Sequence, residues 1–290
     1  MSGSLNPGRQ GTDGRRRTGS QESEPLMRPP LPFRSTAVAV GTAAFAALAA
    51  FGASATPAGA AGAPTKTAQA EYQAAVKAAA NQSVHFETDV TQGNATLQQS
   101  GDAGSTSGSE SLAVNNGKIT EHMSAQVVGK TGYVKGNQVS LKNILGLSAA
   151  QSSKYAGQWL SFPMSNSNLA GLVAGLLRSQ VATELSFGGP FTFAANATVN
   201  GQKAEGIKGT VSSSGGSPVS ETLYVPSTGK PLPIEEVTNP DAKAHTSTIH
   251  GTVSFSKWGE HVAVSAPAHS VSLLKLAAPS GSGTTSTTGG

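Results

Sequence analysis

An alternation of apolar and polar residues begins at Val84 and recurs along most of the chain that follows it. Val84, Phe86 and Val90 alternate with polar residues, which is the pattern of a strand with one face buried and one face in water. Asn-Gly pairs follow two of the alternating runs, at residues 116–117 and 200–201, and their positive φ angles suit tight hairpins. The chain must therefore build a largely antiparallel sheet. The same pattern predicts strands over residues 109–114, 118–128, 131–134, 191–199, 207–211, 221–225, 234–238 and 247–255.

The run over residues 118–128 also predicts which side chains are buried. Ile119, Met123, Ala125 and Val127 share one phase of the alternation, so we expect them to face the core. His122 falls on the opposite phase, and so does His85 in the first strand. Both histidines are predicted to face solvent.

Helical spacing appears before the first strand and again in the middle of the chain. Residues 66–81 predict an amphipathic helix with a thin apolar face. A second helical stretch begins near residue 141. A third carries apolar residues at i, i+3, i+4, i+7 and i+8 over residues 169–177, which predicts one continuous helix ending at Arg178.

The order of these elements is helix, strands, helices and strands again. Antiparallel strands with helices grouped between them indicate an α+β fold. The part that follows the export region has a length that suits one domain, which we place at residues 66–278. Residues 279–290 are rich in Gly, Ser and Thr and are predicted to form a flexible tail.

The N-terminal region has the features of an export signal. Residues 35–63 contain a run of small apolar residues after Arg34 and a small-residue cleavage region. This segment is either a cleaved signal peptide or, since residues 35–55 are long enough to span a bilayer, an uncut anchor. Residues 1–34 are interpreted as a disordered basic leader, and translation starts at Met1 or Met27. We therefore expect an extracytoplasmic protein, secreted or held in the cell envelope.

Composition excludes several classes of function. The chain has no cysteine, so disulfides, thiolate metal sites, a cysteine nucleophile and an acylated N-terminal cysteine are ruled out. No motif predicts a catalytic residue, a metal site or a cofactor. Its excess of basic residues lies largely in the leader, which argues against nucleic-acid binding. We expect a non-enzymatic protein that acts as a monomer.

The apolar stripe over residues 169–177 has two interpretations. It is either ordinary core or, if the helices seat loosely on a curved sheet, the lining of an apolar cavity that holds acyl chains.

Four segments of the chain, in this order, carry a likeness to a known family. They are VVGKTGYVKG at residues 127–136, KYAGQWLSFP at 154–163, LYVPSTGKPLP at 223–233 and VSFSKWG at 253–259. Together they resemble the LppX/LprG-type lipoproteins of actinobacteria (LppX_LprAFG), which belong to the LolA/LolB-like superfamily. The likeness covers residues 66–276. One departure is that those lipoproteins carry a lipobox cysteine, which this chain lacks.

The resemblance implies a bent antiparallel sheet, a half-open β-barrel, with helices on its concave face. It implies that an acyl lipid or glycolipid is bound in an apolar cavity there and carried through the envelope, with the membrane surface as a partner. The cavity-side residues that it implies are Phe86, Met123, Val127, Leu145, Leu169, Leu172, Val173, Leu176 and Phe193. The alternative is a membrane-tethered sensor or protein-interaction module with the same fold and no lipid cargo.

Overall fold

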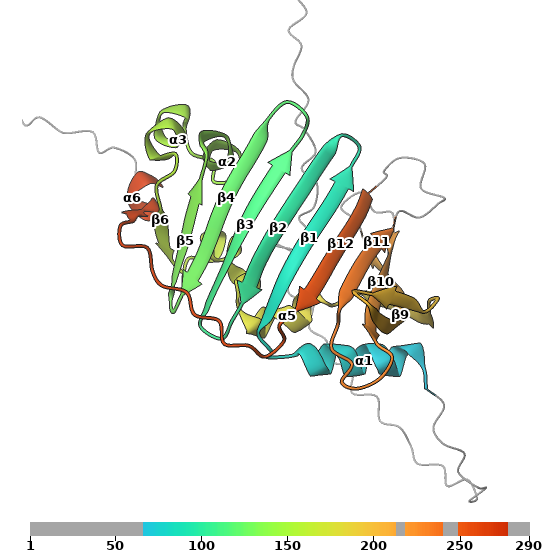
Figure 1. The fold of residues 1–290 in the computed structure, drawn as a ribbon. Helices are drawn as coiled ribbons and strands as arrows, with labels where there is room; N and C mark the ends of the chain where they lie inside the picture. The colour runs from blue at the N-terminus through green and yellow to red at the C-terminus, as the bar shows by residue number, and fades with distance from the viewer. Residues whose placement is uncertain (1–65, 213–217, 240–248, 278–290) are drawn as a thin grey trace, which may run out of the picture.

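The computed structural model describes residues 66–212, 218–239 and 249–277, and Figure 1 shows their arrangement. The predicted leader, export segment and tail lie outside these ranges. The strands form one bent, unclosed sheet in the order β13-β6-β5-β4-β3-β2-β1-β12-β11-β10-β9-β7, with β8 paired to β9. All of its pairings are antiparallel except that of β13 with β6. The fold is α+β, as predicted.

The strands are β1 Val84–Gln92, β2 Ala95–Ala103, β3 Ser107–Asn115, β4 Thr120–Val128, β5 Thr131–Gly136, β6 Leu160–Pro163, β7 Gly188–Phe193, β8 Ala197–Val199, β9 Gln202–Ser212, β10 Pro218–Pro226, β11 Glu235–Asn239, β12 Ile249–Ser256 and β13 Val271–Ser272. The helices are α1 Ala68–Ala79, α2 Gln138–Asn143, α3 Ala149–Tyr155, α4 Ser167–Ala170, the 3-10 turn η1 Ala174–Leu176, α5 Arg178–Glu184 and α6 Leu273–Ala277.

The two faces of the sheet differ in polarity. In β1 the buried positions are every second residue from Val84 to Val90, and the residues between them are more exposed. The buried phase packs with α1, η1 and α5 and is called the inner face below; the opposite phase is the outer face. The predicted alternation is thus confirmed in β1. In β4, Met123, Ala125 and Val127 are buried as expected.

Helix α1 forms where the sequence predicts it. The Oγ1 of Thr67 caps it by accepting a hydrogen bond from the Ala70 amide at 3.2 Å. On its buried side, the Tyr72 hydroxyl donates to the Leu185 carbonyl at 3.1 Å and accepts from the Phe187 amide at 2.9 Å. The Tyr72 ring stacks on that of Phe191, with centroids 4.4 Å apart. These contacts fix α1 beside α5 and β7.

The helix predicted over residues 169–177 is wrong as a single element. The structure divides this stretch into α4 and η1, and α5 follows at once. Two reasons are visible. Gly171 and Gly175 interrupt the stretch and have low helix propensity. In addition, Leu177 is extended and bridges Gly104 in parallel, with the Gly104 amide donating to the Leu176 carbonyl at 3.1 Å.

Two other predictions need correction, and one strand was missed. Ile119 lies in the turn between β3 and β4 and is 43% exposed, so it does not share the buried face of β4. The strand predicted over residues 191–199 is broken into β7 and β8. Strand β2 was not predicted at all, because within it only Leu97 is a large apolar residue. Its nine pairs with β1 nevertheless make it a central strand.

After β12 the chain crosses the strand ends as an extended segment before it reaches β13 and α6 (Figure 1). We call residues 257–270 the strap. The Gly259 amide donates to the Ser83 carbonyl at 2.9 Å, and the Ser107 hydroxyl donates to the Val262 carbonyl at 3.0 Å. The strap thus connects β12, inside the sheet, to β13 at one of its edges.

Candidate functional site

The main hydrophobic core lies on the inner face, near the strand ends where α1 and α5 pack. Phe86 and Val127 from the strands are fully buried there, together with Val173 and Leu176 from the segment before α5. Glycine in the sheet allows the segment before α5 to approach the strands closely. A Cβ at Gly108 would stand 2.2 Å from the Leu176 carbonyl oxygen. The core is therefore built from the sheet and from the broken helical segment together.

A second apolar cluster lies further along the same strands. It contains Val90, Leu97, Leu112 and Met123, each less than a tenth exposed, and it packs against partly buried residues that include Ile144 after α2. The strand register places its four members on the inner face, like Phe86. The inner face is thus apolar in two places along the strands.

Polar side chains separate the two clusters. Thr88 pairs with Gln99 across β1 and β2, and both are buried, with 1% and 8% of their surface exposed. The Gln99 Nε2 donates to the Glu110 carboxylate at 2.5 Å. We call Thr88, Gln99 and Glu110 the polar band. The Oγ1 of Thr88 and the Oε1 of Gln99 are enclosed and have no hydrogen-bond partner.

Glu110 is the electrostatically unusual member of this band. Glu110 is half-buried, and the loss of water around its carboxyl group raises the pKa of that group to about 7, while the hydrogen bond from Gln99 acts in the opposite direction. The Phe86 ring lies near the Glu110 side chain. A Cβ added at Gly101 would stand 2.6 Å from the Phe86 Cζ and 2.9 Å from the Glu110 Cβ. Near neutral pH this carboxyl group therefore exists in both charge states.

A segment of short helical pieces covers part of the inner face. We call residues 167–177, which comprise α4 and η1, the lid. No residue of α4 is buried. Leu169, Leu172 and Leu177 pack against the main core but remain partly exposed, and so does Leu145 after α2. The lid therefore rests on the core with apolar side chains that still contact water.

The nine residues expected to line a cavity do not have one common environment. The inner-face phase holds Phe86, Met123 and Val127, but Met123 belongs to the second cluster. Val173 and Leu176 are the buried residues of the lid, whereas Leu145, Leu169 and Leu172 are partly buried. Phe193 is 41% exposed at the edge strand β7. The structure brings eight of them to the inner face or its cover and leaves Phe193 at the edge.

Sequence reasoning did not identify the polar band. One signal was available, because Thr88 occupies the apolar phase of β1 between Phe86 and Val90. Gln99 lies in β2, the strand that was not predicted, and the partner of Glu110 could not be found without the register. The two predicted solvent histidines do lie on the outer face. His122 is exposed, but His85 is partly covered and contacts the Asp102 carboxylate at 2.8 Å.

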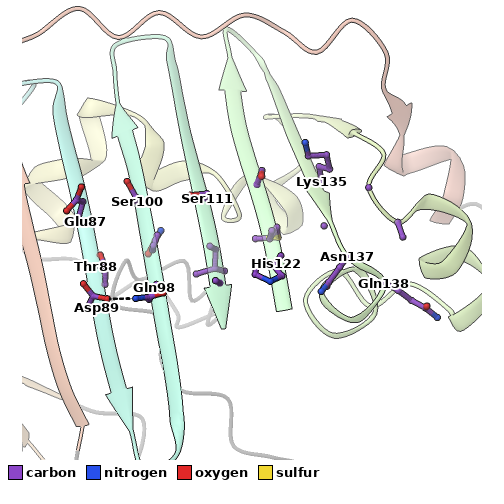
Figure 2. Close-up of a pocket in the computed structure, with 18 residues that line it drawn as sticks. Glu87, Thr88, Asp89, Gln98, Ser100, Ser111, His122, Lys135, Asn137 and Gln138 are labelled. Carbon is purple, nitrogen blue, oxygen red and sulfur yellow. Dashed lines mark hydrogen bonds between the residues drawn. The ribbon is translucent and has the colours of Figure 1, made fainter. Parts of the chain in front are cut away.

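The outer face carries an open groove of about 740 Å³ across β1 to β5 (Figure 2). Its floor is a row of three serines, Ser100, Ser111 and Ser124, which the register places side by side. Glu87 stands at the β1 end of the row and Lys135 at the β5 end. We call this the outer groove. Its hydroxyl groups and its opposite charges offer hydrogen bonds and ion pairs to an extended ligand.

The described part of the chain offers no group of His, Asp and Glu side chains that could hold a metal ion. In the same residues, no helix combines the length and the apolar character needed to cross a bilayer.

Comparisons with known proteins give structural likenesses only. No protein-family model matches the sequence, and no curated protein matches it. The structure is similar to LprF from Mycobacterium bovis, with a TM-score of 0.47 and 15% identity over 70% of this chain and 97% of that one. It is similar to the lipoprotein LppX from Mycobacterium tuberculosis, with a TM-score of 0.44 and 17% identity over 68% and 98% of the two chains.

A LolA superfamily protein from Nitrosomonas europaea gives a TM-score of 0.26 and 8% identity, over 69% of this chain and 96% of that one. All three likenesses fall below 25% identity and a TM-score of 0.5. The fold and the site therefore rest on the geometry of this chain.

Proposed function

We propose that this protein binds the acyl part of a lipid or glycolipid against its inner face and carries it in the cell envelope, without catalysing a reaction. The observation that supports this most is the lid. Leu169 and Leu172 contact the main core and also water. A small displacement of the lid would therefore expose apolar surface both on the lid and on the core beneath these two leucines.

The hydrophobic effect favours binding of an acyl chain to this apolar surface. Burial of each methylene group contributes about 0.8 kcal/mol. A chain that buries roughly ten methylenes would therefore gain about 8 kcal/mol before the costs of ordering. Moving α4 costs less than moving a regular helix, because α4 is four residues long and contributes no buried residue, while Val173 and Leu176 hold the rest of the lid in the core. Release would reverse the same displacement.

The proposal is tested by lipid content and by direct binding. Protein purified from its native host should yield acyl lipid on extraction, identified by mass spectrometry. After delipidation it should bind a fluorescent fatty acid. Leu172→Gln should weaken that binding at least tenfold while the unfolding transition remains cooperative. The matched control is Leu274→Gln in α6, where the leucine is 43% exposed, and it should bind like wild type. Lipid-free protein that also fails to bind the probe would rule out the proposal.

We further propose that the protein works outside the cytoplasm. The support is the export segment at residues 35–63 of the sequence. Mass spectrometry of the N-terminus of the native protein distinguishes the two forms. A new N-terminus within residues 58–64 indicates a secreted or released protein, and an intact segment indicates an anchored one.

The outer groove supports a second candidate function, a protein-interaction module. Opposite charges at its two ends would orient an extended polar segment of a partner. A photo-crosslinking residue placed at Ser111 in the native host should give a discrete adduct that the same residue at the exposed turn position Ile119 does not give. Identical adducts at both positions would contradict this candidate.

A further inference from the structure

The polar band contains two enclosed atoms whose hydrogen-bonding capacity is unused. The Oγ1 of Thr88 and the Oε1 of Gln99 have no partner, although buried polar groups in folded proteins are almost always paired. The two residues are direct cross-strand neighbours on the inner face. From this pairing we propose that the inner face selects lipids that carry a hydroxyl group on the acyl chain, a conclusion that rests on the proposed lipid binding.

The chemistry of the two atoms determines the ligand group. The Gln99 Nε2 donates to Glu110, so the amide is oriented with its Oε1 free, and this oxygen can only accept a hydrogen bond. The Thr88 hydroxyl has a proton to donate and lone pairs that accept. A ligand ammonium group would satisfy Gln99 but could not accept from Thr88, and a ligand carbonyl would do the reverse. A hydroxyl group does both at once.

The surroundings place that hydroxyl within the chain rather than at its end. On one side of the band, Val90 and Leu97 belong to the second apolar cluster. On the other side, Phe86 belongs to the main core. A chain that runs along β1 and β2 would therefore have methylene groups on both sides of its hydroxyl group. Without such a ligand, the unpaired atoms are a cost to the protein.

The test compares two probes of equal length, stearic acid and 12-hydroxystearic acid, on the delipidated full-length protein. Wild type should bind the hydroxylated acid about tenfold more tightly. Thr88→Val preserves shape and removes the hydroxyl, and Gln99→Leu removes the amide. Each should reduce the ratio of the two Kd values to about one, while stearic acid binds as well as it does to wild type or better. The matched control is Thr91→Val, an exposed β1 residue on the outer face, which should keep the tenfold ratio.

Stability gives a second readout that does not depend on the ligand. Removing an unpaired buried hydroxyl should raise the thermal unfolding midpoint of the Thr88→Val protein when it is free of lipid. If the site instead holds a trapped water molecule, this midpoint should fall and the two acids should bind wild type equally, which would overturn the inference. Equal and tight binding of both acids would leave the proposed lipid binding intact. Failure of both acids to bind would overturn both proposals.

Discussion

Glu110 shows how one residue gives the inner face a dependence on pH. Desolvation raises the pKa of its carboxyl group to about 7, whereas an unfolded chain leaves this pKa near the ordinary value. Between those two values the folded protein binds the proton and the unfolded chain does not. The stabilisation is thus complete at acid pH, below the unfolded pKa, and is lost as pH rises through about 7.

We therefore predict that the free energy of unfolding falls between pH 5 and pH 8 by about 2–3 kcal/mol more in wild type than in Glu110→Gln. Glutamine keeps an oxygen for the Gln99 amide and has no proton to lose. Urea denaturation at the two pH values measures the difference. Glu87→Gln, on the exposed outer face, is the control and should retain the wild-type slope. A Glu110→Gln protein with that same slope would show that desolvation does not raise the pKa of the Glu110 carboxyl group.

The structure of the lid depends on its contacts with the sheet more than on its own sequence. Gly108 in β3 lies beneath Leu176, and the Arg178 amide donates to the Gly104 carbonyl at 2.7 Å. The Leu176 carbonyl of the lid and the Arg178 amide of α5 thus both bond to Gly104 after β2, which a continuous helix could not do.

Substituting Gly108 by alanine should detach this contact. The added Cβ would meet the Leu176 carbonyl oxygen at 2.2 Å, so the lid must move, and we expect a loss of about 1–3 kcal/mol in the free energy of unfolding. Hydrogen exchange at the Gly104 and Arg178 amides should become faster while the amides of α1 stay protected. Gly188→Ala provides the control, because its Cβ would meet only the Thr210 oxygen at 3.4 Å. Unchanged exchange in Gly108→Ala would contradict the close packing of the lid.

The strap contributes to the stability of the whole sheet, because it connects β12 to β13 at the far edge. Leu273 beyond the strap is 5% exposed, and the Val271 amide donates to the Trp159 carbonyl at 2.9 Å. Gln151 of α3 donates through its Nε2 to the Leu276 carbonyl at 2.9 Å. The last described residues thus stabilise the β6 edge of the sheet.

A chain that ends at Ser256 should lose these contacts and unfold more easily than one that ends at Ala277. Burial of one leucine and a few hydrogen bonds together contribute about 3–5 kcal/mol. Guanidinium unfolding of the two chains measures the difference, and the longer one is the matched control because it retains every contact described for the strap. Equal midpoints would show that the strap does not stabilise the sheet.

The local pattern of residues determined a large part of this protein. Alternation and hairpin turns predicted most of the strands, and helical spacing predicted α1, because each signal is carried by neighbours in the chain. The pairing of strands across the sheet is not local. For that reason β2, with Leu97 as its one large apolar residue, was recognised only by its partners β1 and β3.

The sequence by itself therefore determined the class of fold, the phase of the buried face in β1 and β4, and the absence of cysteine chemistry. The tertiary structure alone decided the division of residues 169–184 into short pieces and the exposure of Ile119 and Phe193. It also decided that Thr88, Gln99 and Glu110 meet. The physical reason is the same in each case: backbone bonds and burial depend on residues that register and packing bring together, and these are far apart in the chain.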